Sequence, residues 1–352
     1  MSVIQPKTFY TLTLTRWIAA ICVVFFHFGT VDKSGWGSQL NLAVSYFFVL
    51  SGFVMVVAHQ HENRLDFWHF IGKRLARIYP LYLLALIAFS LINWVLHHVF
   101  SLPLFAINAL LLESWIPGKA LSYHFPGWSL STEFFFYLSF PFIWNRIFSR
   151  YTLHKMLFLT IVVWFSSQCI FEEWINQPHC SPLLKETLPY FPLLHLNQFM
   201  WGCLGGILFI NWPLKRDLGI GLFIILNIIY GIAPRWVPFS INGHNGWYAP
   251  LFAGLIVGLA VWEQQKSFPF LKRIQLLGNA SYAVYILQLP VYTLFHFVLQ
   301  KYFTNQQLGF WVYVIILQII AIGCTKWIEK PAQKWVLQLW GKMVDTSERL
   351  IK

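Results

Sequence analysis

The chain has 352 residues, of which 57% are hydrophobic, 19% aromatic and only 11% charged, whereas about a quarter of the residues of an average soluble domain are charged. Its mean hydropathy of +0.58 implies more apolar surface than a protein surrounded by water can expose. These values exclude an ordinary soluble protein. They predict an integral membrane protein that crosses the bilayer many times.

The net charge of +12 does not indicate a nucleic-acid partner, because the basic residues are spread through short loops between apolar runs. We interpret the charge as topology information instead. The five cysteines lie mostly inside apolar runs and lack the spacing of metal ligands. We therefore expect neither a disulfide framework nor a bound metal.

Ten apolar runs are long enough to cross about 30 Å of hydrocarbon, which takes roughly 20 helical residues. They lie near residues 14–30, 42–60, 79–99, 129–147, 155–172, 192–211, 217–233, 248–264, 280–300 and 308–328. A further run at 102–116 contains Glu113 and is interrupted by Pro103 and Pro117, which favours an interfacial or re-entrant segment. The predicted fold class is thus all-α integral membrane, with about ten transmembrane helices.

Lys and Arg in the connections predict the orientation, because cytoplasmic loops carry an excess of them. With the amino terminus inside, all but five of the 25 basic residues fall on the inner side; the exceptions are Lys33, Lys119, Lys185, Arg235 and Lys301. Ten spans with both termini cytoplasmic follow. We expect residues 1–352 to form a single membrane domain, with a core of about 10–332 and an amphipathic cytoplasmic tail at 333–352 that lies on the inner surface.

Charged or titratable side chains inside a span are costly unless they are paired or face water, so each marks a candidate site. Arg16 and His27 share the first span, and their spacing places them on one helix face about 16 Å apart along the axis. Glu133 lies five residues into the fourth span, about as deep as His27. Structural roles are the alternatives: Arg16 can reach the inner headgroups, His27 can be a packing residue, and Glu133 can join helices.

A basic cluster, Lys73, Arg74 and Arg77, lies at the inner start of the third span. It follows an amphipathic stretch, residues 65–71, that can lie in the membrane interface. Guanidinium groups bind phosphate through two parallel hydrogen bonds, so the cluster is a candidate phosphate site. The alternative is that it only carries the positive-inside signal.

Several motifs follow one another in an order typical of one family. They are Arg16 and, after ten residues, His27; residues 46–53 in the second span; residues 74–80 at the start of the third; residues 128–130 with Glu133 and 136–137 in the fourth; and residues 278–285 and 329–331 near the end. Together they resemble acyltransferase family 3, the membrane-bound O-acyltransferases. The resemblance covers the chain from Arg16 to Pro331.

The resemblance implies a ten-span core in a bacterial cytoplasmic (inner) membrane. Such a core moves an acyl group, usually acetyl, from cytoplasmic acyl-coenzyme A, the co-substrate, to a hydroxyl of an extracytoplasmic polysaccharide or glycolipid. The resemblance implies His27 as the catalytic base and Arg16, Arg74 and Arg77 as residues of the donor site. Lys73 belongs to the same basic cluster. Glu133 or another polar group near His27 is expected to orient its ring.

Two departures from the family pattern affect these expectations. Gln288 stands where the family commonly has a histidine in the ninth span, so we expect no second imidazole in the mechanism. No segment after the tenth span resembles the esterase-like extracytoplasmic domain of some relatives. Acceptor specificity is then expected to come from the outer loops, while the acceptor's identity and the oligomeric state are not predicted.

Two alternatives remain open on the sequence alone. Direct transfer is the expected route, but an acyl-enzyme on Ser129, Ser131 or Ser51 is a second route. A multi-span transporter or a lipid-linked glycan flippase would also be basic inside and polar at mid-membrane. Transporters of that kind usually contain two related halves, and no internal repeat is visible in the apolar segments.

Overall fold

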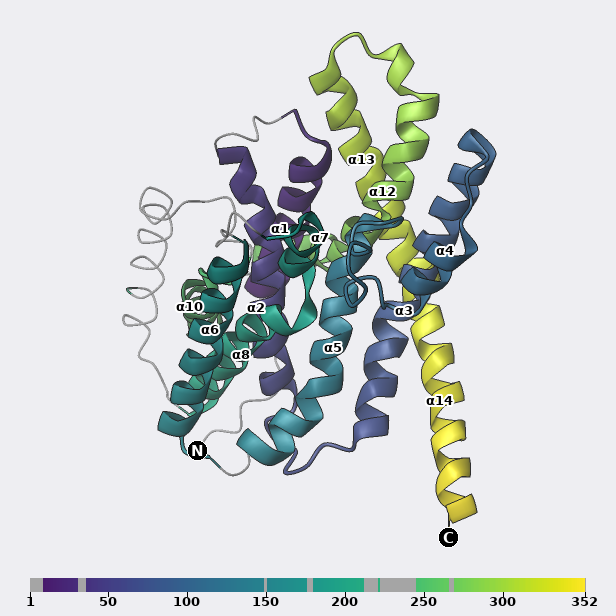
Figure 1. Ribbon diagram of the computed structural model, residues 1–352. Helices are drawn as coiled ribbons and strands as arrows, with labels where there is room; N and C mark the ends of the chain where they lie inside the picture. Colours follow the sequence, from purple (N-terminus) through teal and green to yellow (C-terminus); the bar gives the residue numbers. More distant parts are fainter. Residues whose placement is uncertain are drawn as a thin grey trace. The chain divides into compact units, whose positions relative to one another are not determined.

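The computed structural model describes residues 9–30, 36–148, 151–175, 180–211, 221, 245–265 and 269–351. Within these residues the chain is helical and contains no strand, as predicted for an all-α protein (Figure 1). It divides into two compact units. The first comprises residues 1–27, 31–62 and 151–278, and the second residues 28–30, 63–150 and 279–352.

Helices α2, α8 and α10 form the centre of the first unit, and α6 packs on α8 (Figure 1). Its core contains the fully buried side chains of Val49, Phe53 and Ile256. Its elements are α1 (Tyr10–Phe28), η1 (Trp36–Asn41), α2 (Leu42–Ala58), α6 (Leu153–Ile175), α7 (Pro182–Thr187), η4 (Leu188–Tyr190), α8 (Pro192–Asn211), α10 (Ala249–Gln265) and α11 (Pro269–Asn279).

The backbones of α2 and α8 touch at two glycines. A Cβ atom placed on Gly202 would lie 1.8 Å from the carbonyl oxygen of Val49, and one placed on Gly52 would lie 2.1 Å from the carbonyl oxygen of Phe199. Small residues allow this close approach, and the van der Waals packing that results contributes to the association of helices in lipid.

A buried carboxylate holds the start of α1. Glu263 of α10 accepts hydrogen bonds from the backbone N–H groups of Tyr10 (2.6 Å) and Thr11 (2.8 Å), and also from the Thr11 hydroxyl. The first N–H groups of a helix have no partner within the helix, and their partial positive charge favours an anion. Glu263 therefore fixes the first turn of the helix that carries Arg16 and His27.

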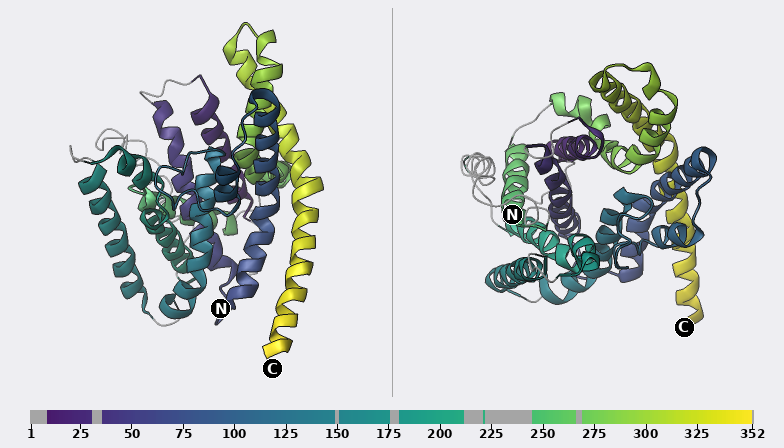
Figure 2. Two further views of the ribbon diagram at one scale, coloured as in Figure 1. Left: turned by 45° about the vertical axis from the view of Figure 1, so that its right-hand side comes forward. Right: turned by 45° about the horizontal axis from the view of Figure 1, so that its top comes forward.

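The second unit is built around α3, which packs against α5, α12 and α14. Both views in Figure 2 place the last helix, α14, alongside α3. Its elements are α3 (Phe67–His97), α4 (Leu102–Ala109), η2 (Phe125–Gly127), α5 (Trp128–Ile143), the π-helical turn η3 (Trp144–Phe148), α12 (Ser281–Val298), η6 (Gln300–Tyr302), α13 (Gln306–Cys324), the π-helical turn η7 (Thr325–Glu329) and α14 (Lys330–Ile351).

Two tyrosines of α3 hold the end of α4. The Tyr79 hydroxyl donates to the carbonyl oxygen of Ala109 (2.9 Å), and the Tyr82 hydroxyl donates to that of Asn108 (2.8 Å). These bonds satisfy carbonyl groups that the last turn of a helix leaves without partners. With 8 residues, α4 is about 12 Å long. It is too short to cross a bilayer, as predicted for the segment 102–116.

Seven helical segments in the described part of the chain are long and apolar enough to cross a membrane, and each overlaps a predicted span. They are Tyr10–Phe28, Gly37–Ala58, Phe67–His97, Leu153–Trp174, Pro182–Asn211, Ser281–Val298 and Gln306–Met343. Two further predicted spans, 129–147 and 248–264, correspond to the shorter helices α5 and α10. The predicted span 217–233 lies outside the described residues except for residue 221. The chain is thus an integral membrane protein, while the count of ten and the orientation stay predictions.

The structure differs from the sequence analysis at the start of the third span. Helix α3 begins at Phe67, so the stretch 65–71 and the basic cluster are mostly part of one helix of 31 residues rather than an interfacial segment before it. Asp66 sets this start, because its Oδ1 accepts a hydrogen bond from the backbone N–H of His69 (2.7 Å). The charges of the basic cluster lower the local hydropathy and hide the helix start from a count of apolar residues.

The contact between α2 and α8 predicts a strong effect of Gly202→Ala. The added methyl group would meet the backbone of Val49, which cannot move aside as a side chain can, so the free energy of unfolding should fall by at least about 1–3 kcal/mol. Gly341→Ala is the control, because nothing lies within 4 Å of the added atom and Ala favours a helix over Gly. Thermal unfolding of the purified proteins measures both. Equal unfolding midpoints for the two variants would contradict the close approach.

Candidate functional site

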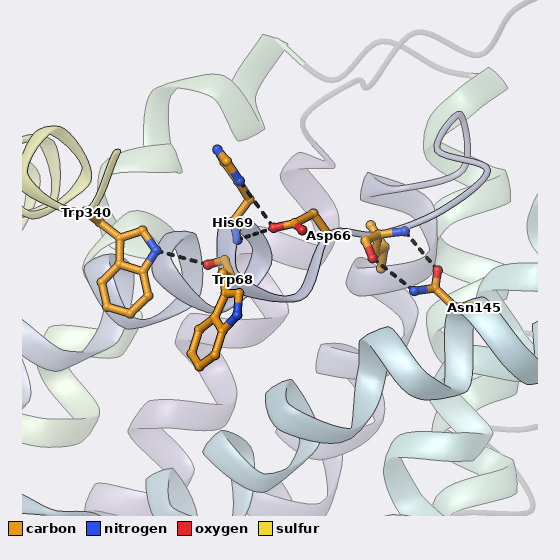
Figure 3. Close-up of polar contacts among 6 residues, drawn as sticks. Asp66, Trp68, His69, Asn145 and Trp340 are labelled. Atoms are coloured by element: carbon orange, nitrogen blue, oxygen red, sulfur yellow. Dashed lines mark hydrogen bonds and ion pairs between the residues drawn. The ribbon is translucent and has the colours of Figure 1, made fainter. Parts of the chain in front are cut away.

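The first turn of α3 is held by side chains of the second unit (Figure 3). The Asn145 amide forms two hydrogen bonds with the backbone of Leu65: its Oδ1 accepts from the N–H group, and its Nδ2 donates to the carbonyl oxygen, both at 2.9 Å. Asp66, the residue directly before α3, caps the first turn of the helix. These contacts fix the direction in which α3 starts, and thereby the place of the basic cluster two turns later.

The three basic side chains differ in exposure. Lys73 is exposed, while Arg74 and Arg77 are half-buried. The guanidinium carbon of Arg74 lies 5.1 Å from the centroid of the Phe70 ring, a favourable arrangement of cation and aromatic face. Two half-buried guanidinium groups and an exposed ammonium group on one helix suit an anion with several phosphates.

Glu133 lies in the same neighbourhood as the basic cluster. The Tyr137 hydroxyl donates to Glu133 Oε1 at 2.5 Å, one helical turn away on α5. The positive charges of Arg77 and Arg74 act on this same hydroxyl. Glu133 is half-buried, so its carboxylate and the two guanidinium groups form one polar region of the second unit.

Helix α12 and the turn η7 complete this region. The Tyr282 hydroxyl donates to the carbonyl oxygen of Ile78 (2.6 Å), and the charges of Glu329 and Glu133 act on it. The polar region therefore contains Arg74, Arg77, Glu133, Tyr137, Tyr282 and Glu329. Tyr137, Tyr282 and Glu329 belong to the motifs quoted above, but the sequence analysis assigned them no role. The partner of Tyr282, Ile78, lies 204 residues away along the chain. Tyr137 and Glu133 are only one helical turn apart, and this i, i+4 spacing is the signal by which their contact could have been found.

Two serines considered as acyl-enzyme candidates are already hydrogen-bonded. Ser129 Oγ donates to the carbonyl oxygen of Pro126 (3.1 Å) and lies 2.7 Å from the Tyr285 hydroxyl. Ser131 Oγ donates to the carbonyl oxygen of Leu111 (2.6 Å). Both serines are buried.

Arg16 and His27 belong to the first unit. Both lie on α1 as predicted. In the turn that holds Arg16, Thr15 Oγ1 lies 2.5 Å from the Tyr46 hydroxyl of α2, and the charge of Arg16 acts on that hydroxyl. Glu133 is part of the second unit, so its predicted approach to His27 stays a prediction.

A buried network of amides joins α6, α8 and the start of α10 in the first unit. Asn197 Nδ2 donates to Ser167 Oγ (2.8 Å) and to the carbonyl oxygen of Asn245 (3.1 Å). Gln168 Nε2 donates to the same carbonyl oxygen (3.0 Å). Such bonds hold helices together in lipid, so a structural role explains why these polar side chains are buried.

The connection between α4 and α5 encloses two titratable groups, Glu113 and His124, both fully buried. Burial raises the pKa of the Glu113 carboxyl to about 8 and lowers the pKa of the His124 imidazole to about 4. A Cβ atom placed on Gly127 would lie 3.0 Å from the Tyr82 hydroxyl and 3.1 Å from Glu113 Oε1, so these two oxygens flank the same glycine. Near neutral pH the connection is thus packed with uncharged polar groups.

Comparison with known proteins gives a family match over most of the chain. The model of a family described as an acyltransferase domain matches residues 9–328. Acyltransferase MdmB of Streptomyces mycarofaciens is 30% identical over 215 residues, 55% of this chain and 52% of that protein. O-acetyltransferase OatA of Staphylococcus aureus is 23% identical over 366 residues, 94% of this chain and 58% of that protein. The chain thus matches little more than half the length of these relatives. No solved structure matches.

The buried carboxyl of Glu113 predicts a pH dependence of stability. Its pKa in the folded protein, about 8, is above the ordinary value of 4.5. Between these two values the folded protein holds a proton that the unfolded chain has lost, so stability should fall by up to about 1.4 kcal/mol for each unit rise in pH. Glu113→Gln keeps a neutral side chain at every pH and should remove this slope.

Thermal unfolding of the purified protein between pH 5 and about pH 8 measures the effect. The unfolding midpoint of Glu113→Gln should exceed that of the unchanged protein increasingly as pH rises. Glu186→Gln, which removes an exposed carboxylate, should leave the pH profile unaltered. Parallel profiles for Glu113→Gln and the unchanged protein would contradict the burial of a protonated carboxyl.

Proposed function

Because the chain belongs to acyltransferase family 3, we propose that it is a membrane O-acyltransferase, and specifically an O-acetyltransferase. It moves an acyl group from cytoplasmic acyl-coenzyme A to a hydroxyl of an extracytoplasmic polysaccharide or glycolipid. The names of two relatives, an acyltransferase and an O-acetyltransferase, support this reaction class. A transporter or flippase, the alternative kept on the sequence alone, is not favoured by the family match.

The proposed binding site for acyl-coenzyme A rests on one observation. Arg74 and Arg77 present a pair of half-buried guanidinium groups near the start of α3, which Asp66 and Asn145 fix. Coenzyme A carries a diphosphate and a further phosphate, and planar guanidinium forks bind such groups bidentately. Lys73 adds an exposed cation. Arg16 completes the donor site in this proposal, on the strength of the family resemblance.

His27 is the catalytic base of the proposed reaction. Its neutral imidazole takes the proton of the acceptor hydroxyl as the oxygen attacks the thioester carbonyl. The new carbon–oxygen bond forms, the carbon–sulfur bond breaks, and coenzyme A leaves as a thiolate that the imidazolium can protonate. In this proposal Glu133 orients His27. The hydrogen bonds that engage Ser129 and Ser131 support direct transfer over an acyl-enzyme.

The proposal places the protein in a bacterial cytoplasmic membrane, with ten spans and both termini inside. The basic cluster then faces the cytoplasm, where acyl-coenzyme A is made, and His27 lies near the outer face. The distribution of Lys and Arg supports this orientation.

Mass spectrometry of surface polysaccharide and glycolipid tests the reaction. The polysaccharide or glycolipid of cells with the protein should carry an added acyl mass, about 42 Da where the group is acetyl. This mass should be missing from cells without the protein and from cells with His27→Gln. Identical spectra from all three would contradict the proposed function.

Replacement of Arg74 and Arg77 tests the donor site. Each Ala substitution should weaken binding of acyl-coenzyme A, because a charge-assisted hydrogen bond contributes on the order of 1.5–3 kcal/mol. Lys at either position should restore binding only in part, since an ammonium group lacks the planar fork. Titration calorimetry on the purified protein measures the affinity. Arg64→Ala, which removes an exposed cation of the same unit, is the control and should leave the affinity unchanged. An unchanged affinity in the variant with Ala at both 74 and 77 would mean that the cluster only directs the topology of the chain.

Replacement of His27 tests the catalytic base. His27→Gln should reach the membrane in normal amounts and bind acyl-coenzyme A, yet lose the roughly 100- to 10,000-fold that positioned proton transfer contributes, because an amide cannot accept the proton. Turnover of acyl-coenzyme A with a polysaccharide acceptor measures the loss. A well-folded His27→Gln protein that keeps most of its turnover would eliminate the base role, and Glu133 would then be tested first.

A further inference from the structure

The last helix, α14, lies outside the part of the chain that the family model covers. The match ends at residue 328, and α14 begins at Lys330. It follows α13 and η7 without a break (Figure 1), and the helical path from Gln306 to Met343 has 38 residues. At 1.5 Å per residue this length is about 57 Å, almost twice the hydrocarbon thickness of a bilayer. A large part of α14 therefore extends beyond the membrane.

Helix α3 is also longer than the bilayer requires. Its 31 residues span about 46 Å, so one end extends beyond the hydrocarbon as well. The start of α3 carries Lys73, Arg74 and Arg77, whose charges favour water or headgroups over lipid tails. Helix α14 packs against α3, and its contacts with Trp68 and Gly72 lie directly before the basic cluster.

A single tryptophan of α14 contacts the backbone of this part. Trp340 Nε1 donates a hydrogen bond to the carbonyl oxygen of Trp68 (3.0 Å; Figure 3). A Cβ atom placed on Gly72 would lie 2.3 Å from Cδ1 and Nε1 of the same indole. Residues 68 and 72 are one turn apart on one helix face, so the indole occupies the space that a side chain at position 72 would need.

Gly72 is otherwise unfavourable in this position. In the interior of a helix, Gly destabilises by roughly 0.5–1 kcal/mol relative to Ala, so its presence needs a reason such as close packing. The residue directly after it is Lys73, and Arg74 and Arg77 follow within the next turn and a half. The indole is therefore fixed one turn before the side chains proposed to hold the donor.

We propose that Trp340 is a positioning residue for the donor site: by packing on Trp68 and Gly72 it fixes the segment of α3 that presents Arg74 and Arg77 to the phosphates of acyl-coenzyme A. The inference rests on the proposed function. In this proposal α14 contributes to the affinity for the donor. It does so in addition to the hydrogen bonds of Asp66 and Asn145, which also fix the start of α3.

The test uses the full-length protein, purified and assayed for acyl transfer with the donor and the acceptor varied in turn. Trp340→Ala should raise the KM for acyl-coenzyme A by about three- to tenfold, the scale of one lost contact, with a smaller change in kcat and in the acceptor KM. Trp340→Phe keeps a ring but loses the N–H donor, and should give a smaller rise in the donor KM. Trp335→Ala, on the same helix and 62% exposed, is the matched control and should behave like the unchanged protein.

Gly72→Ala provides an independent reading. The added methyl group displaces the indole, so the donor KM should rise as it does for Trp340→Ala. In the double variant Gly72→Ala with Trp340→Ala there is no indole to displace. Its donor KM should be no higher than that of Trp340→Ala alone, because the two substitutions break one contact. Additive effects of the two substitutions would overturn the proposal.

The remaining outcomes also decide the question. A folded Trp340→Ala protein with an unchanged donor KM would overturn the positioning role, as would an equal loss in the donor KM, the acceptor KM and kcat. If Trp340→Ala does not accumulate, the donor KM of Trp340→Phe decides, and an unchanged value overturns the proposal. Arg74→Ala is measured alongside: an unchanged donor KM there would refute the proposed donor site itself, whatever Trp340 does.

Discussion

In a chain so poor in charge, the constraint on which the described structure depends is that polar groups in an apolar setting need partners. Side chains supply them at the ends of helices. Glu263 accepts hydrogen bonds from the first N–H groups of α1, and Asn145 forms two with the backbone before α3. Tyr79 donates one to a carbonyl oxygen at the end of α4. Each bond joins segments far apart in sequence. The same bonds that satisfy the backbone therefore also fix where the helices begin and end.

Within the second unit, α3 is the element on which most of these contacts converge. Asn145 and Trp340 hold its start, its early turns carry Arg74 and Arg77, and the Tyr82 hydroxyl further along donates to the end of α4. A displacement of its first turns would thus move the cations. If Arg74 and Arg77 hold the donor as proposed, a change at the start of this helix should alter donor affinity more than acceptor affinity.

The sequence predicted the fold class and the positions of most apolar helices, because hydrophobic runs of sufficient length are a local property. It did not predict the start of α3 at Phe67, because the charges of Lys73 and its neighbours lower the local hydropathy and mask the first turns. It also gave no role to Glu263 or Trp340. Their partners lie 253 and 272 residues away along the chain, and no local pattern identifies a contact over such a separation.

Glu133 shows how placement changes the interpretation of a candidate residue. Counting residues along the fourth span puts it near the outer face, far from an inner basic cluster. In the second unit, however, its carboxylate accepts a hydrogen bond from Tyr137, on which Arg74 and Arg77 also act. A carboxylate in the same polar region as two guanidinium groups offsets part of their positive charge, and so weakens their attraction for a phosphate. Removing it with Glu133→Gln should then strengthen donor binding if its main partner is the basic cluster, and should slow turnover at unchanged donor affinity if its main partner is His27. Measuring donor affinity and turnover on that one variant separates the two roles.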